Sequence, residues 1–250
     1  LDRADALNSA VPNERDLGAT FYWAPHEIRQ RFKSLLDQGL KGSGDYGVLG
    51  VGVNNGQSAN QPEANDELMV VARATYPFLL ESGQFLELGV QGYINTFESQ
   101  ALKPTSVPFA GADARRDRRV AASLVWYPQP FGFQAEWNVG DSPAYDREQG
   151  VIRNQVLRGG YAQVMWLFKG AAGQLIPFLK FQVYDGGKKQ EQDARYHQVR
   201  DWELGAEWQV SPALELTLDY TVSDRTTSDA TKPWDAQQGN LLRLQAQFNY

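Results

Sequence analysis

The residue types that most often carry out catalysis are sparse in this chain, which has two histidines and no cysteine. His26-Glu27 begins like the His-Glu-x-x-His zinc motif, but position 30 is a glutamine where the motif needs its second histidine. His197 has no nucleophilic serine beside it on an outward strand face, as a hydrolase would need. Gly50 and Gly52 lack the third glycine and the following helix of a dinucleotide-binding fingerprint. We therefore expect no enzyme activity, no metal site and no cofactor.

Charged side chains instead recur at alternate positions of short segments. Because successive side chains of a strand point to opposite faces, charges of one parity share a face. Two chemistries are open to the cations on that face. They can attract ions moving through water beside them, or they can form ion pairs with carboxylates of the same parity, which outnumber them. The cations are Arg73, Arg119, Lys180 and Arg243, and the carboxylates are Glu87, Glu136, Glu203, Glu207, Glu215 and Asp219.

The segments that hold these charges alternate between apolar and polar residues, as half-buried strands do. Nearly every segment has one face without any charge, and most are close to ten residues long, about the length that a tilted strand needs to cross a bilayer. The last segment is the clearest, because Leu242, Leu244, Ala246 and Phe248 alternate with polar residues. We predict eleven strands, at residues 17–23, 46–54, 67–76, 85–95, 118–127, 131–139, 158–169, 175–185, 201–210, 213–222 and 241–250.

Aromatic residues gather towards the ends of the apolar faces. Such placement is typical of the aromatic girdles by which outer-membrane barrels meet the two surfaces of the lipid bilayer, whereas a soluble core would accept aromatics anywhere along a strand. We therefore expect these side chains to lie at the membrane interface, in contact with lipid. They are Trp126, Trp137, Trp166, Trp202, Trp208, Tyr220 and Tyr250.

The links between the predicted strands alternate in length, which is typical of barrels with long outer loops and short periplasmic turns. A sandwich with Greek-key links would not keep this order. The exception is the link 24–44, where Ile28, Phe32, Leu35 and Leu36 have helical spacing and predict a short surface helix over 26–40. The long links are 97–117, 140–157, 186–200 and 223–240, and the short ones are 77–84, 128–130, 170–174 and 211–212.

Composition and strand count further limit the possible class of protein and its fold. The longest apolar runs are far shorter than the about 20 residues of a membrane helix, and the net charge of −6 argues against nucleic-acid binding. We predict an all-β chain, with residues 1–250 forming a single transmembrane antiparallel β-barrel domain. Eleven strands are an odd number, whereas bacterial single-chain barrels usually close with an even one. Either one strand escapes the pattern, or N-terminal strands of a larger barrel are missing, and the start of the chain in loop-like sequence favours the second.

Several segments resemble the phosphate-selective porin O/P family. They include LDRADALNSAVPNERDLGA at 1–19, DYGVLGVGVNNG at 45–56 and NDELMVVARATYPF at 65–78. The closing strands, from GYAQVMW at 160–166 to LRLQAQFNY at 242–250, resemble those of the family as well. Each motif is short, so the order and spacing of the motifs carry the resemblance, which covers nearly the whole chain. The long link at 24–44 departs from the family pattern.

The resemblance implies a porin of the Gram-negative outer membrane, a passive diffusion channel for small solutes, in particular anions such as phosphate. Family members are trimeric barrels of about sixteen strands, so about five strands would precede residue 1. The resemblance also implies contact with outer-membrane lipid and recognition of the C-terminal strand by the barrel-assembly machinery.

The resemblance extends the set of pore-lining candidates. Residues 1–16 resemble the end of the family's constriction loop, which adds Arg3 and Arg15 to the strand cations. Arg73 stands where the family has a strand arginine. Lys180 stands where an arginine is usual, and a lysine would read phosphate geometry less sharply because it lacks the bidentate guanidinium.

Two other classes of protein remain open from the sequence. One is a complete, smaller outer-membrane barrel of about twelve strands, acting in adhesion or assembly through its outer loops. The other is a soluble β-sandwich, which would dissolve without detergent. A porin should give ion currents in planar bilayers, and the two alternatives should not.

Overall fold

A computed structural model of the chain describes residues 4–10, 16–40, 47–57, 65–98 and 105–248. In this part of the chain twelve strands form one sheet, and all but β8 follow one another in chain order, each antiparallel to the next. The strands are β1 (Gly18–Trp23), β2 (Leu49–Asn54), β3 (Met69–Leu79), β4 (Phe85–Thr96), β5 (Arg116–Trp126), β6 (Phe131–Asp146), β7 (Val151–Trp166), β8 (Phe168–Gly170), β9 (Gly173–Gly187), β10 (Tyr196–Ser211), β11 (Leu214–Ser228) and β12 (Asp235–Phe248).

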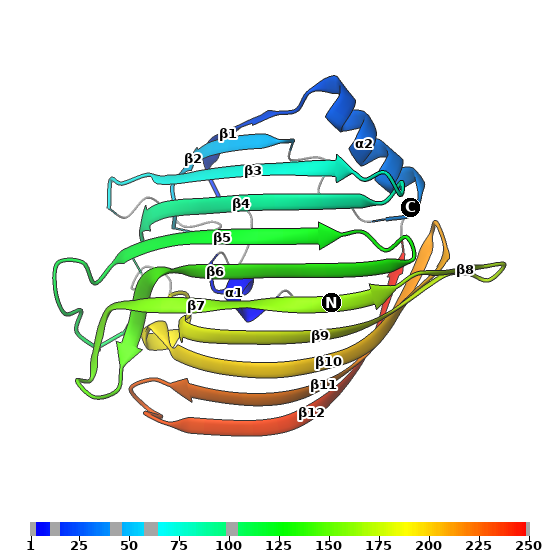
Figure 1. The fold of residues 1–250 in the computed structure, drawn as a ribbon. Helices are drawn as coiled ribbons and strands as arrows, with labels where there is room; N and C mark the ends of the chain where they lie inside the picture. Colours follow the sequence, from blue (N-terminus) through cyan, green and yellow to red (C-terminus); the bar gives the residue numbers. More distant parts are fainter. Residues whose placement is uncertain (1–3, 11–15, 41–46, 58–64, 99–104, 249–250) are drawn as a thin grey trace.

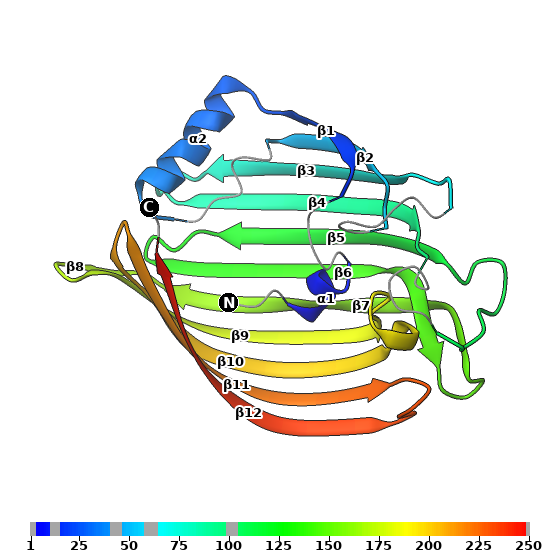
Figure 2. The same ribbon diagram turned by 180° about the vertical axis from the view of Figure 1, so that it is seen from behind.

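The sheet is strongly curved, and short helical segments lie on it (Figures 1 and 2). These are α1 (Asp5–Asn8), α2 (His26–Asp37) and the 3₁₀ turn η2 (Gln192–Ala194). α1 lies within the curve of the sheet, and α2 lies at the end where the short turns are (Figure 2). In the ranges given above, every helix is too short or too polar to span a membrane.

The two faces of the sheet differ as the alternation predicts. In β10, Asp201 and Glu203 are 0 % and 8 % exposed, whereas their neighbours Trp202 and Leu204 are 51 % and 62 % exposed. We call the charged face, which carries α1, the inner wall and the apolar face the outer wall. A sheet with its charges covered and its large apolar side chains open is the reverse of a soluble fold, and it suits a barrel with water inside and lipid outside.

Several strands are longer than predicted at the end away from the short turns. The link expected at 140–157 is mostly hairpin, because β6 runs to Asp146 and β7 begins at Val151. β10 and β11 likewise extend through Tyr196 and Ser228. Beyond the apolar band both faces of these strands carry polar residues, so the alternation fades although the ladder of hydrogen bonds continues.

The strand count and the edges of the sheet follow from the pairing. The segment predicted at 158–169 is the end of β7 followed by β8, which pairs with β9, and the other predicted segments each match one strand. β1 and β12 form the two edges, and in the described ranges they are not paired with each other. The prediction of successive antiparallel strands is therefore confirmed. In the described residues these strands form an open sheet.

The predicted helix exists as α2, but it ends at Asp37, and Leu36, which the spacing placed in its apolar stripe, is 55 % exposed. Ile28, Phe32 and Leu35 of α2 are buried against Phe85 and Tyr127, which belong to the inner wall. The helical spacing correctly identified an apolar stripe. It could not tell whether that stripe would face the protein or be left on the surface, because this depends on which wall lies under the helix.

Candidate functional site

The inner wall holds the segment that contains α1. Arg119 of β5 donates from Nη1 to the carbonyl of Ala6 at 3.0 Å and to Ser9 Oγ at 2.7 Å. Its Nη2 donates to the carbonyl of Ser9 at 2.9 Å. The Ser9 hydroxyl in turn donates to the Ala6 carbonyl at 2.9 Å. A helix of four residues is not stable alone, so these bonds to the wall are what keep α1 in place.

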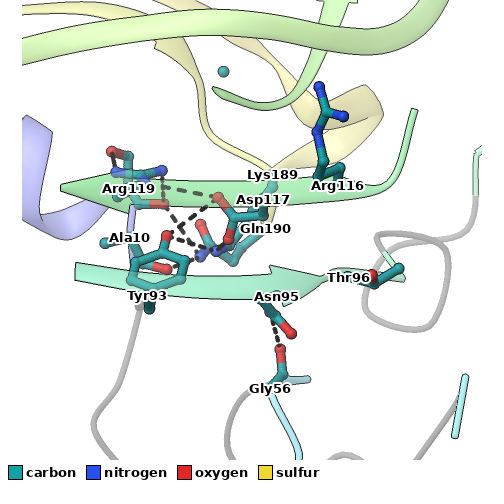
Figure 3. A network of polar contacts seen from close by, with 12 residues as sticks. Ala10, Gly56, Tyr93, Asn95, Thr96, Arg116, Asp117, Arg119, Lys189 and Gln190 are labelled. Carbon is teal, nitrogen blue, oxygen red and sulfur yellow. Dashed lines mark hydrogen bonds and ion pairs between the residues drawn. The ribbon is translucent and has the colours of Figure 1, made fainter. Parts of the chain in front are cut away.

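A buried carboxylate joins Arg119 to an outer loop (Figure 3). Asp117 is 0 % exposed, and its Oδ1 lies 3.7 Å from Arg119 Nε and accepts a hydrogen bond of 3.2 Å from the Tyr93 hydroxyl. Its other oxygen pairs with Lys189, which comes from residues 188–195 between β9 and β10. Burial lowers the pKa of the Lys189 ammonium to about 8, although the Asp117 carboxylate opposes the fall. The pair fastens this loop to the wall.

A second carboxylate, on α1 itself, attracts two more cations. Lys188 Nζ lies 2.5 Å from Asp5 Oδ1, and Arg225 Nη2 of β11 lies 3.1 Å from Asp5 Oδ2. Arg225 also pairs with the buried Asp201 of β10. Gln182 of β9 accepts from the Asp5 backbone N–H and donates to Asp201 Oδ2, both at 2.9 Å. α1 is thus bound to the wall through its side chains as well as its carbonyls.

These charged groups form one cluster on the inner wall, which we call the α1 cluster. Its seven members are four cations and three carboxylates, and Glu191, whose Oε1 lies 3.8 Å from Lys188 Nζ, is a fourth carboxylate beside them, so the charges at this place balance. Only Arg225, with a side chain 34 % exposed, offers a cation of appreciable accessibility, since the side chains of Arg119 and Lys189 are 2 % and 3 % exposed. The members are Arg119, Lys188, Lys189, Arg225, Asp5, Asp117 and Asp201.

The other predicted cations lie on the inner wall beside carboxylates. Arg73 Nη2 is 3.6 Å from Glu87 Oε1, and Lys180 Nζ is 2.9 Å from Glu203 Oε1. Arg243 of β12 is half-buried, directly across the ladder from Asp219 of β11. The ion-pair interpretation is therefore what the structure shows for Arg73 and Lys180, whereas Arg119 bonds mainly to the α1 segment. Arg3 and Arg15 lie outside the described residues.

The sequence reasoning missed three cations of the α1 cluster. Lys188 and Lys189 stand in a stretch predicted to be an outer loop, and nothing in the sequence says that this loop turns inward. Arg225 could have been found, because it continues the inward parity of Asp219, Thr221 and Ser223 past the predicted end of that strand at 222.

The predicted interface aromatics lie on the outer wall. Trp202 and Trp208 of β10 are 51 % and 40 % exposed and stand at the two ends of the apolar stretch that also contains Leu204. At the short-turn end, Phe131 stacks edge-on between Trp126 and Trp166, with ring centroids 5.9 and 6.3 Å apart. Trp137 and Tyr220 are exposed on the same wall, and Tyr250 lies outside the described residues. Their role at the lipid interface stays a prediction.

The chemistry of this site is electrostatic. Among the described residues no three side chains of histidine, aspartate or glutamate are grouped closely enough to hold a metal ion. The fixed charges of the inner wall and of the α1 segment can attract or repel a hydrated solute that passes along them, and the side chains can limit its size.

Comparison with known proteins agrees with this geometry. The family model described as phosphate-selective porin O and P matches residues 26–250. No curated protein matches the chain.

Proposed function

The chain belongs to the phosphate-selective porin O and P family, a family of outer-membrane porins and not of enzymes, and on this premise we propose that it lets small anions such as phosphate diffuse through the outer membrane. The observation that carries the proposal is the reversed sheet. Its inner wall bears the ion pairs of α1, Arg73 and Lys180, while its outer wall exposes leucine, valine and tryptophan. Water beside the inner wall and lipid beside the outer wall would stabilise both faces of the sheet.

The preference for anions is supported by the α1 cluster. Arg225, the most exposed cation of the cluster, lies on the inner wall beside the α1 segment, where a fixed positive charge would act on an anion that passes close to it. Arg225 and Arg73, with side chains 34 % and 27 % exposed, are the members of the inner wall best placed to meet an anion. The wall also carries Glu207 and Glu215, so the selectivity we propose is local to the constriction and not a property of the whole lumen.

Closure of the barrel is part of the proposal. In the described ranges the outer edges of β1 and β12 are unpaired, and such edges cannot face lipid, because each carries backbone groups that need hydrogen-bond partners. We propose that residues 1–250 are the larger part of one porin barrel, completed by strands that precede them. The family resemblance adds a homotrimer and assembly through the C-terminal strand. For the latter, β12 offers an edge on which Leu242, Leu244 and Phe248 are 68 %, 73 % and 71 % exposed.

Planar-bilayer recording tests the proposal. The complete protein, with the strands that we propose precede residue 1, should give discrete conductance steps in chloride solution, and phosphate added to the bath should reduce the chloride current. Arg225→Glu should shift the reversal potential in a salt gradient towards cation preference. Lys232→Glu is the matched control, because the same change of charge is made on an outer loop where the side chain is 66 % exposed.

Two results would overturn the proposal at different levels. A folded protein that carries no current would refute the channel and favour a barrel that acts through its outer loops. A channel indifferent to phosphate and unchanged by Arg225→Glu would leave a general porin and remove the anion preference.

A further inference from the structure

Among the described residues the inner wall is apolar beneath α1 and, over a larger area, at the end where the short turns are. There Phe85, Tyr127 and Leu167 are 4 %, 3 % and 6 % exposed, and Val125 and Ile176 pack beside them. Elsewhere the inner wall carries ion pairs and hydrogen-bonded polar groups. An apolar band facing the water of a channel would be costly, and here α2 covers it.

The contacts of α2 are those of an amphipathic helix on an apolar surface. Ile28, Phe32 and Leu35, which lie one helical turn or nearly so apart, are 3 %, 2 % and 0 % exposed against this band. Leu40, just past the helix, is 3 % exposed in the same cluster. Removing side chains of this size from water stabilises the docked position of the helix.

Polar contacts at both ends show how far α2 reaches along the wall. Arg31 Nη1 donates to the carbonyl of Pro77 in β3 at 3.0 Å. At the other end Gln129, in the turn between β5 and β6, donates from Nε2 to Gln38 Oε1 at 2.7 Å. Gln174 of β9 reaches the Gln38 carbonyl at 3.5 Å. The helix and the residue that follows it therefore contact the short-turn rim at β3, at the turn between β5 and β6, and at β9, and Figure 1 shows α2 at this end of the sheet.

The opposite face of α2 is polar and open to water. Glu27 pairs with Arg31 and Lys33 pairs with Asp37, each at 2.7 Å, and the side chains of Glu27 and Lys33 are 74 % and 73 % exposed. A helix of twelve residues is about 18 Å long, and with its side chains it is about 10 Å across. A body of that size on the inner side of the rim takes up part of the opening.

We propose that α2 narrows the short-turn mouth of the channel and so limits the size of the solutes that pass, at a second position separate from the α1 cluster. This inference rests on the proposed channel function. In this proposal Ile28, Phe32 and Leu35 position the helix. The polar face of α2 lines the short-turn mouth of the channel.

Undocking the helix tests the proposal. Phe32→Asp places a charge in the apolar contact, which is unfavourable unless the helix leaves the wall. We expect the single-channel conductance to rise about twofold, because a body about 10 Å across leaves the mouth, and we expect larger polyethylene glycols to enter the pore. Phe32→Leu is the matched control at the same position, because leucine keeps the contact apolar and the helix docked, and both readouts should stay unchanged.

A second variant tests whether a change in conductance comes from loss of the helix and not from loss of the fold. Replacing residues 26–38 by a short glycine-serine link removes the helix without burying a charge, and a shift in gel mobility on heating shows whether the barrel is intact. Because the chain has no cysteine, Gln38→Cys and Gln129→Cys can be joined by a short bismaleimide in the Phe32→Asp background, which should bring the conductance back.

The outcomes separate this inference from the proposed function. If the parent protein carries no current, the channel itself is refuted. If the parent conducts and the folded helix-less variant has the same conductance and the same polymer cutoff, the channel stands and the role of α2 is refuted. A larger pore in both variants with an unchanged response to phosphate would support α2 as a size filter independent of anion preference.

Discussion

Arg119 Nη2 donates a hydrogen bond of 2.9 Å to the backbone carbonyl of Ser9, a residue 110 positions earlier in the chain. The arginine belongs to the wall and the serine to the segment that lies inside it. A charged side chain whose parity predicts that it lines the pore therefore holds the α1 segment in place. Its effect on a passing solute would be indirect, through the position of α1.

Replacing Arg119 by lysine should loosen the α1 segment. A lysine cannot serve the carbonyls of Ala6 and Ser9 with the planar fork of a guanidinium, and a buried carbonyl left without a partner costs about 1–3 kcal/mol. A cysteine introduced at Ala10, in a chain that has none, should then react with a maleimide about tenfold faster. Arg118→Lys is the control, since Arg118 pairs with Asp141 instead. Equal labelling rates in both variants would contradict the anchoring role.

The Lys180–Glu203 pair should be strongly coupled. Both side chains are at most 10 % exposed, so Lys180→Met leaves a buried carboxylate without its partner, which typically costs about 3–5 kcal/mol. The double variant with Glu203→Gln should regain most of that loss. Urea unfolding in lipid vesicles, analysed as a double-mutant cycle, measures the coupling. An additive result would show that the two side chains act independently.

Charge on the outer wall should be far more costly than charge on the inner wall. Val164 of β7 is 41 % exposed on the outer wall, between Phe133 and Leu179 in the ladder. Val164→Arg should lower the free energy of unfolding in lipid by about 2–4 kcal/mol if the site lies near the bilayer midplane. Gln163→Arg, one residue earlier on the inner wall, should cost much less. The same cost at both positions would mean that the two walls are wrongly assigned.

Acid should loosen the outer loop between β11 and β12. Burial alone would raise the pKa of Asp229, but hydrogen bonds from Thr231 and Lys232 and the charge of Arg195 bring it below its ordinary value. A carboxyl with a lowered pKa in the folded state stabilises that state fully above its unfolded pKa of about 3.9 and loses this contribution as the pH falls through the folded value.

Hydrogen exchange of residues 229–234 measures this effect. Protection should be constant from neutral pH down to about pH 4, after correction for the intrinsic rate, and should fall below it. Asp229→Asn should remove the pH dependence. A loop that keeps its protection at about pH 2 would show that the carboxylate contributes nothing to its order.

The strands, their faces and the polarity of each face could be predicted from the sequence, because in a strand the direction of a side chain depends on a local period of two. Each predicted strand is present, and the tested inner and outer residues, such as Glu203 and Trp202, lie on the expected walls. The prediction was weakest where both faces are polar, so the extensions of β6, β7, β10 and β11 were assigned to loops.

The placement of everything that rests on the walls was decided only by the tertiary structure. Nothing in the local pattern shows that Lys189 turns inward to Asp117, that Arg119 holds Ser9, or that the stripe of α2 docks beside Phe85. These contacts join residues far apart in sequence, and they form because a buried charge needs a partner and an apolar band needs cover. The sequence by itself determined a wall that is charged on one face and apolar on the other, and the folded chain decided which segments are held against the charged face.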